Sequence, residues 1–320
     1  MKKQILTILL IFIIYPSISQ SSKKSKIDSL INEKEVENFV RSIDYYNYNF
    51  DYENFIISNI QKVKTKYNEK YFLCKKIADS LNVTKSFYKA DFDKNGLTDI
   101  LVIGSNYYFS TFVIMDFGND NLKIYRLTRK IFPEFAVPEI IKKDNKTLIN
   151  YYYIEHQNWR EKIKKEDIIK KTLIYKFGDF IEYNGNPKDY NIEKIEFQTS
   201  MCFGKCPVFN IKIDNNKNAT FIAQIYNKNR KEKEIQGEFK TIIKEEDYNL
   251  IVDLLNYIDF PNLKDDYAVG WTDDQTSFLT ITYNNGKVKE IRDYGLIGTF
   301  GLDKLYDLFF ELRFNQKWKK

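Results

Sequence analysis

The stretch KIEFQTSMCFGKCPVFNIKI, residues 194–213, decides the fold of the second half of the chain. Apolar and polar side chains alternate at its two ends, 194–199 and 208–213, which predicts two strands with one buried face. A loop that carries two cysteines, Cys202 and Cys206, lies between these strands.

The sequence that follows continues this pattern. Further strands are expected at 220–226, 234–243, 277–283 and 287–292, the last two joined by a turn at 284–286. Apolar residues at helical spacing predict one helix over 246–258 and a last helix around residues 302–312. Strands in runs with helices set apart from them indicate an α+β fold with an antiparallel sheet.

The first half has the same character. Helical periodicity is found around residues 36–43 and 69–81, and strands are expected at 86–90, 99–104, 109–115, 122–127, 147–154 and 172–177. The turn-rich stretch 184–190 predicts a domain boundary. We therefore expect N-terminal helices plus an antiparallel sheet in residues 20–185, then a second antiparallel sheet with two helices in residues 190–320.

The composition favours a compact fold of one large domain or two medium ones. Of the 320 residues, 43% are hydrophobic and 16% aromatic, which is enough for real cores and unlike a disordered chain. The formal charge is +6, but lysines are interleaved with acids along the chain. Nucleic acid is therefore not an expected partner.

The N-terminus has the three parts of a secretory signal. Lys2 and Lys3 supply positive charge, residues 5–14 form an apolar run, and small residues precede a predicted cleavage after Ser19. The run is too short to span a bilayer, which takes ~20 residues. We expect residues 1–19 to be removed and the protein to be exported, periplasmic or secreted, with no transmembrane segment after cleavage. An uncleaved membrane anchor is the alternative.

Residues 91–99, DFDKNGLTD, form a calcium-loop candidate. Oxygen-bearing side chains stand at Asp91, Asp93, Asn95 and Asp99, and the Leu97 carbonyl could add a ligand. Ca²⁺ takes 6–8 oxygen ligands, and three carboxylates packed this closely repel one another without a cation. An EF-hand is excluded because its twelfth position needs a bidentate Glu and holds Val102 here. An ordinary turn without metal is the alternative.

This loop resembles the D-x-D-x-N-G-x-x-D loops of FG-GAP and VCBS repeats, including the apolar strand that follows it. The resemblance covers about fifteen residues. Those repeats build propellers from several copies, whereas one copy is found here, so a propeller is not expected. From the oxygen ligands we expect Ca²⁺ as the cofactor, in a role that fixes the turn and takes no part in catalysis.

The two cysteines of the 202–206 loop have three open interpretations. In an oxidising compartment they are a disulfide candidate. They could also remain free thiols, or serve in metal binding or redox chemistry. Metal binding or redox chemistry is the least favoured, because the chain has one histidine, His156, and one further cysteine, Cys74, to complete such a site. Cys74 lies on an apolar helix face, which predicts a buried free thiol.

The string CFGKCPVFNI from Cys202, followed by Gly237, Thr272-Asp273 and a terminal helix, resembles the DUF6438 family over about residues 190–315. This family is an uncharacterised domain of exported proteins. One departure is the sequence GTFG at 298–301, where the family tends to have a proline before its last helix. The resemblance implies a domain but no reaction.

No sequence motif identifies a reaction. There is no G-x-S-x-G, P-loop or dinucleotide fingerprint, and a lone His156 is not expected to be catalytic. Asp273 and Asp274 form a possible ligand site, but adjacent acids on an extended chain point to opposite faces. We expect a non-enzymatic binding or interaction module stabilised by Ca²⁺, with an unknown protein or envelope component as partner. The alternative is an envelope or extracellular hydrolase of unrecognised type.

Overall fold

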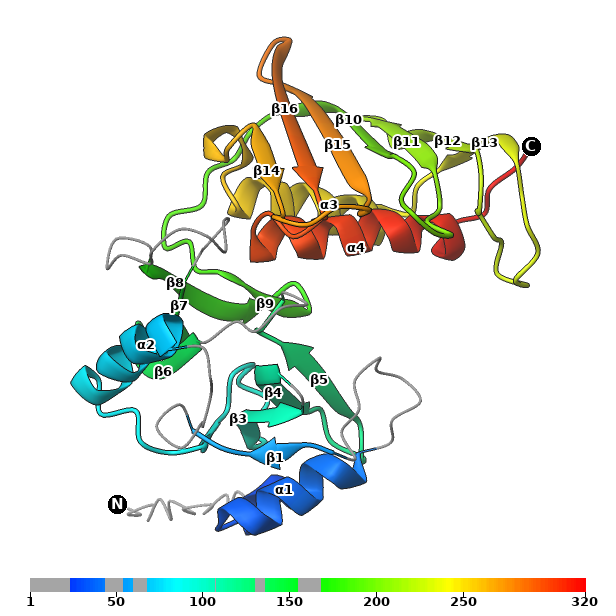
Figure 1. Ribbon diagram of the computed structural model, residues 1–320. Helices are drawn as coiled ribbons and strands as arrows, with labels where there is room; N and C mark the ends of the chain where they lie inside the picture. Colours follow the sequence, from blue (N-terminus) through cyan, green and yellow to red (C-terminus); the bar gives the residue numbers. More distant parts are fainter. Residues whose placement is uncertain (1–23, 44–53, 60–67, 107, 130–135, 155–167) are drawn as a thin grey trace, which may run out of the picture.

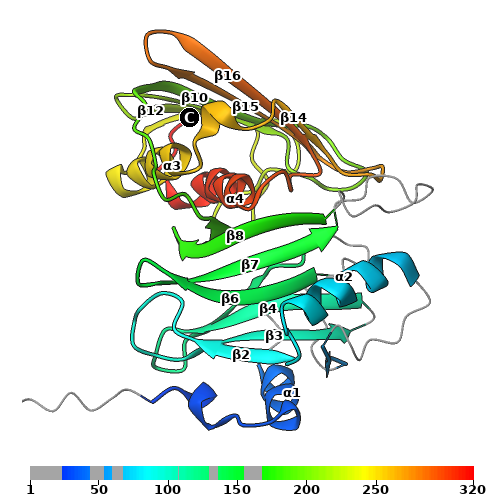
Figure 2. The same ribbon diagram turned by 90° about the vertical axis from the view of Figure 1, so that its left-hand side faces the viewer.

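The computed structural model describes residues 24–43, 54–59, 68–106, 108–129, 136–154 and 168–320. Three β-sheets are stacked in layers, with the last two α-helices of the chain between two of them and the first α-helix on the outer face of another (Figures 1 and 2). The expected α+β class with antiparallel sheets is confirmed in this coarse form. The predicted signal segment and His156 lie outside the described residues, so those two predictions stay predictions.

Sheet A is built around a central hairpin. Strand β3 pairs with β4 on one side, and both β1 and β2 lie along its other edge, opposite different parts of it. The strands of sheet A are β1 (Ile56–Ile57), β2 (Phe87–Ala90), β3 (Asp99–Asn106), β4 (Tyr108–Asp116) and β5 (Leu122–Arg126). Gly104 is required in β3, because a Cβ there would come within 2.5 Å of the Ile56 carbonyl oxygen.

Helix α1 (Glu33–Ser42) covers one face of sheet A. Asn32 caps it by accepting a hydrogen bond from the Glu35 N–H, and Glu33 and Glu35 stand in its first turn, where the helix dipole favours acids. Its Val36 and Val40 pack in a cluster with Phe55 and with apolar side chains of β3 and β4.

Sheet B is a four-stranded antiparallel meander against the other face of sheet A. Its strands are β6 (Ala136–Lys143), β7 (Lys146–Ile154), β8 (Ile168–Lys176) and β9 (Asp179–Glu182). Leu101 and Val113 of sheet A share a core with Tyr151 and Phe180 of sheet B, and helix α2 (Asn68–Ser80) adds Cys74 and Ala78. The expectation of one sheet in residues 20–185 is thus corrected to two. The alternation of apolar and polar residues along a strand specifies which face of the strand is buried, but not which sheet the strand joins.

Sheet C has seven strands in the order β13-β12-β11-β10-β15-β16-β14. They are β10 (Ile192–Thr199), β11 (Phe209–Asp214), β12 (Asn218–Ala223), β13 (Gly237–Ile242), β14 (Asp266–Ala268), β15 (Thr276–Tyr283) and β16 (Lys287–Tyr294). All its pairs are antiparallel except the short β14, which runs parallel to β16. Helices α3 (Glu245–Tyr257) and α4 (Phe300–Asn315) cover one face, as Figure 1 shows.

Sheet B lies between sheet A and the helices of sheet C (Figure 2). Leu148, Ile174 and Ile181 of sheet B belong to the same apolar cluster as Leu302 and Leu305 of α4. The division into two domains at 184–190 remains a prediction, but apolar packing continues across it.

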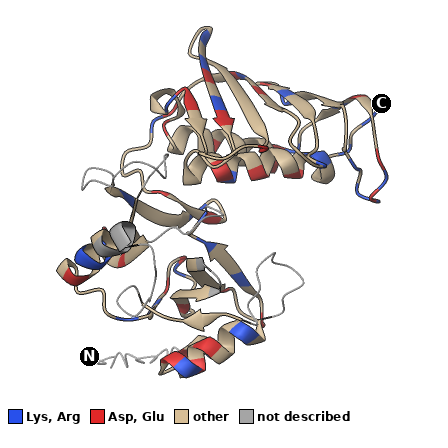
Figure 3. Cartoon of the chain, viewed as in Figure 1, with Lys and Arg blue, Asp and Glu red and all other residues tan. Residues whose placement is uncertain are grey.

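Charged residues of both signs are distributed over most elements, as Figure 3 shows. Among the described residues, no helix is long and apolar enough to span a membrane.

Candidate functional site

The loop from Asp91 to Asp99 joins β2 to β3 and gathers its acids at one point. One carboxylate oxygen each from Asp91, Asp93 and Asp99 lies within 4.8 Å of the others. Gly96 has φ +82°, a conformation that glycine adopts without strain, and Lys94 also has a positive φ of 63°. The turn therefore folds the chain back so that side chains at alternate positions converge.

Hydrogen bonds within the loop hold the acids in place. The Gly96 N–H donates to Asp91 Oδ2 at 3.0 Å, and the Asn95 N–H donates to Asp93 Oδ1 at 3.1 Å. The Asn95 side chain donates to Asp93 Oδ2 and to the Asp116 carbonyl, while its Oδ1 accepts from the Leu97 N–H. Asn95 thus ties the loop to the end of β4.

Asp99 is the most enclosed of the three acids, with no exposed surface. Its two oxygens accept hydrogen bonds from the Phe92 N–H at 2.8 Å and the Asp116 N–H at 2.9 Å. Burial raises the pKa of Asp99 to about 7, and the neighbouring charges of Asp93 and Asp91 act in the same direction. Burial also raises the pKa of Asp93, with the nearby Asp91 contributing.

Asp91 has an oxygen that this network does not satisfy. Its Oδ1 is buried without a hydrogen-bond partner in the described part of the chain. A buried acceptor without a partner is costly, and a hard cation would satisfy it while neutralising the acids around it. The donor set therefore fits Ca²⁺ in its chemistry, and ligation by Asn95 and by the Leu97 carbonyl stays a prediction.

Two residues outside the loop brace it, and sequence reasoning missed both. Ser25 Oγ lies 3.1 Å from the Thr98 carbonyl oxygen and 2.6 Å from Asp116 Oδ2 at the end of β4, and Asp28 Oδ1 accepts a hydrogen bond from the Thr98 hydroxyl at 2.6 Å. Ser25 and Asp28 also form a capping box on the short 3₁₀ helix Lys26–Ser29. The Ser-x-x-Asp spacing of a capping box was the readable signal, although it does not reveal the contact with the loop.

The second candidate region is the loop between β10 and β11. Cys202 and Cys206 form a disulfide with their Cα atoms 5.8 Å apart, whereas Cys74 is buried in α2 and takes no part in this disulfide. The loop exposes two large apolar side chains, since Met201 is 68% exposed and Phe203 is 87% exposed. These two residues and the disulfide, which we name the disulfide knob, place apolar surface in solvent on a covalently closed support.

The structure brings the disulfide knob next to Asp273 and Asp274. The Phe203 N–H donates to the Asp273 carbonyl at 3.0 Å, and the Gln275 side chain donates to carbonyls on both sides of the knob, Ser200 and Pro207. The two acids do not converge on a common point among the described contacts. Asp274 Oδ2 accepts from the Trp271 indole at 2.9 Å, while Asp273 Oδ2 accepts from the Thr272 hydroxyl at 3.2 Å.

A third group of ionisable residues lies at the junction between sheet B and α4. Burial raises the pKa of Asp179 at the start of β9 to about 6 and that of Asp303 in α4 to about 7. Arg129 opposes both shifts, and its guanidinium stacks 3.9 Å from the centre of the Phe300 ring. Sequence reasoning missed this group because its members are about 50 to 170 positions apart in the chain.

Comparisons with known proteins agree with the second half of this description. Residues 193–313 match the model of DUF6438, a domain of unknown function, which confirms the resemblance that the Cys202 string predicted for this part of the chain. No curated protein and no solved structure matches the chain. The resemblance of the Asp91–Asp99 loop to FG-GAP and VCBS repeats remains an expectation.

Proposed function

We propose that this protein is an exported binding module that contacts a partner protein in the envelope or outside the cell through the disulfide knob. The observation that carries the proposal is the 87% exposure of Phe203 within a loop closed by a disulfide. Exposed aromatic and methionine side chains are enriched at protein interfaces, and a rigid support reduces the entropy lost on binding.

Hydrogen bonds from neighbouring side chains hold both ends of the disulfide knob in place. Thr199 Oγ1 donates to the Pro207 carbonyl at 2.8 Å, and the Gln275 side chain bonds to carbonyls on both sides of the loop. Burying one phenylalanine side chain on binding contributes about 1.5–3 kcal/mol. Such a residue at the centre of an interface would be a hot spot for the partner.

We prefer a binding module over a hydrolase because Asp273 and Asp274 form hydrogen bonds with their own neighbours in the chain. Acid–base catalysis on a substrate needs two groups that reach the same reacting atoms. Asp273 and Asp274 instead bond to Thr272, Trp271 and the Gln275 N–H. We therefore rank the hydrolase as the second hypothesis, tested by whether Asp274→Asn abolishes any hydrolytic activity on envelope polymers.

We assign a structural role to Ca²⁺ in this proposal. The ion would be held by Asp91, Asp93 and Asp99, and would fix the turn that leads into β3. The buried, unsatisfied Asp91 Oδ1 supports this assignment. The disulfide knob and the calcium loop are in different sheets, so the ion would stabilise the module without touching the partner.

The binding proposal is tested by site-specific photo-crosslinking in the native cell. A photoreactive phenylalanine analogue placed at Phe203 should give one crosslinked product of defined mass. The same analogue at Val288, which is 57% exposed on β16, serves as the matched control. The product should disappear in a Cys202→Ser, Cys206→Ser variant that remains folded. Equal crosslinking from both positions would contradict the proposal.

Export is tested separately by N-terminal sequencing of the protein recovered from the cell envelope or medium. We expect the recovered chain to begin at Gln20. A chain that keeps its first nineteen residues and stays in the membrane fraction would support the uncleaved anchor instead.

A further inference from the structure

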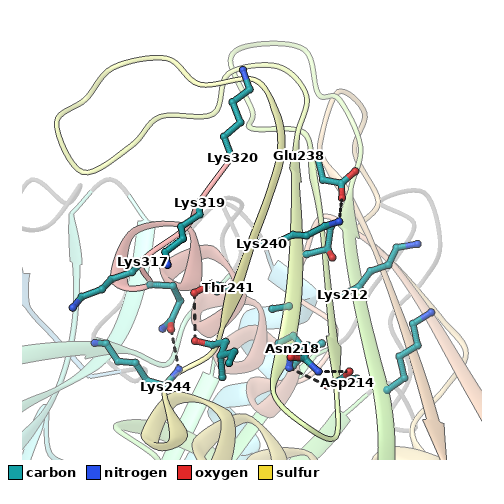
Figure 4. A pocket seen from close by; sticks show the side chains of 16 residues that line it. Lys212, Asp214, Asn218, Glu238, Lys240, Thr241, Lys244, Lys317, Lys319 and Lys320 are labelled. Atoms are coloured by element: carbon teal, nitrogen blue, oxygen red, sulfur yellow. Dashed lines mark hydrogen bonds and ion pairs between the residues drawn. The ribbon is translucent and has the colours of Figure 1, made fainter.

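A groove beside the edge of sheet C is lined by lysines from several parts of the chain. Among the residues that the structure describes, seven lysines and two acids line it, and its volume is about 1170 Å³. Figure 4 shows Lys212 and Lys240 of the strands and Lys317, Lys319 and Lys320 of the C-terminal tail around the same open space. The sequence disperses these lysines over more than 120 positions, so the concentration of charge is a property of the fold.

The tail lysines are held in place by the backbone and by Trp318. The backbone of Lys319 pairs with that of Lys240 through two hydrogen bonds of 2.7 and 3.0 Å, which extends the edge strand β13. The Trp318 indole donates to the Leu312 carbonyl at 2.9 Å, and its ring packs against Phe221. The tail is thus a fixed wall of the groove.

The charges of the tail are available to a ligand. On the strand side, Lys212 forms a half-buried ion pair with Glu196 at 2.9 Å, and Lys240 forms an exposed one with Glu238 at 3.1 Å. Exposed ion pairs of this kind add little to stability. Lys317, Lys319 and Lys320 are exposed, and within the described residues none of them has a carboxylate within 4 Å. The groove therefore presents an uncompensated positive wall.

The lining indicates which anionic partner fits. No arginine and no aromatic side chain is among the described residues that line the groove. Single-stranded nucleic acids are held by aromatic stacking, and bidentate phosphate recognition favours arginine. The volume also exceeds the roughly 300–1,000 Å³ of a typical small-molecule site. Lysine ammonium groups spaced along an open groove suit repeated carboxylate or sulfate groups on an extended chain.

We infer that this groove binds a linear anionic polysaccharide. The lysines neutralise successive acidic groups, and release of counterions drives association. Binding should weaken steeply with salt, because the contacts are at the surface and are screened. This site is separate from the disulfide knob and from the calcium loop, and the inference does not depend on either.

The test is binding of fluorescent dextran sulfate and of alginate to the purified protein at low and at physiological salt, with neutral dextran as a blank. The variant Lys317→Ser, Lys319→Ser, Lys320→Ser keeps the backbone pairing with Lys240. It should bind roughly tenfold more weakly or worse, because three groove charges are removed. The control variant Lys142→Ser, Lys143→Ser, Lys287→Ser removes the same charge at exposed positions outside the groove and should bind as the parent does.

Three results would overturn the inference. Equal weakening in both triple variants would show an effect of net charge alone. Tighter binding of a thymidine oligonucleotide or of anionic lipid vesicles than of either polysaccharide would assign the groove to another class of partner. No binding at low salt would remove the site altogether. If circular dichroism shows that the tail variant is unfolded, Lys212→Ser with Lys244→Ser tests the groove lysines outside the tail instead.

Discussion

The Glu182 carboxylate accepts a hydrogen bond from the backbone N–H of Gly301 at 2.9 Å, although the two residues are 119 positions apart. Its other oxygen accepts from the Phe300 N–H at 3.0 Å, and Thr299 Oγ1 accepts from the Leu302 N–H. Backbone N–H groups in the first turn of α4 therefore find their hydrogen-bond acceptor in an acid of sheet B. The helix dipole also favours a negative charge at this end of the helix.

Glu182→Ala should lower the free energy of unfolding by about 1–3 kcal/mol, because two hydrogen bonds to a charged acceptor are lost. Urea denaturation measures this change. Glu290→Ala, at an exposed position on β16, is the control and should shift the midpoint little. A variant as stable as the parent would mean that water replaces the cap without cost.

Ca²⁺ should raise the melting temperature of the protein relative to EDTA. A ligand that binds only the folded state at about 100 times its Kd adds ~2.7 kcal/mol, which corresponds to several degrees. Asp93→Asn should abolish the rise. Asp214→Asn is the matched control, since Asp214 also organises a turn, by accepting from the Asn216 and Asn218 N–H groups, but lies outside the acidic cluster. An unchanged melting temperature would make 91–99 an ordinary turn.

Replacing both cysteines of the disulfide knob with serine should cost about 2 kcal/mol, the loop-closure entropy expected for a ring of five residues. Differential scanning calorimetry should show a melting temperature a few degrees lower, and a reducing agent should produce the same decrease in the parent. Cys74→Ala should keep the sensitivity to reduction, because Cys74 is not in the disulfide. A parent that does not respond to complete reduction would contradict this prediction.

Stability should fall as pH rises from 5 to 8 in the absence of Ca²⁺, partly because of Asp303. Its folded pKa is raised from 3.8 to about 7, mainly by burial. Its contribution is therefore fully present below pH ~4 and lost as the pH rises through ~7. Asp179 acts with the same sign, while Arg129 opposes the shift and Asp307 and Asp293 add to it.

Asp303→Asn should accordingly reduce the decrease in melting temperature between pH 5 and pH 8. Glu246→Gln, an exposed acid in the first turn of α3, provides the control for removing a charge near a helix N-terminus. A slope that Asp303→Asn leaves unchanged would show that this carboxyl group is solvated.

Much of sheet C could be predicted because its signals are local. The helix expected at 246–258 is α3 at Glu245–Tyr257, and the expected turn at 284–286 has positive φ angles at Asn284, Asn285 and Gly286. The string around Cys202 predicted the match of residues 193–313 to the DUF6438 model. By contrast, the three-residue strand β14 has too few residues for alternation to be visible, and its parallel pairing depends on residues of β16 that follow it.

The candidate site divides in the same way. Spacing alone places Asp91, Asp93 and Asp99 together, because a sharp turn brings alternate residues of one loop to one side. The contact of Ser25 with Asp116 joins residues 91 positions apart and leaves no local pattern. The groove lysines leave no local pattern either, because they come from three strands, from the N-cap of α3 and from the C-terminal tail.

The position of α4 has a consequence for how this protein can be divided. The family match ends at residue 313 and begins at residue 193, after sheet B. Yet α4 uses one side against sheet C and meets Leu148, Ile174 and Ile181 of sheet B with another. A fragment cut at the start of the family match would expose this second side of α4 to solvent. The first turn of α4 would also lose its hydrogen bonds to Glu182. The segment that the family model covers is therefore smaller than the unit that should be expressed, and a fragment meant for crystallisation should keep β6 to β9.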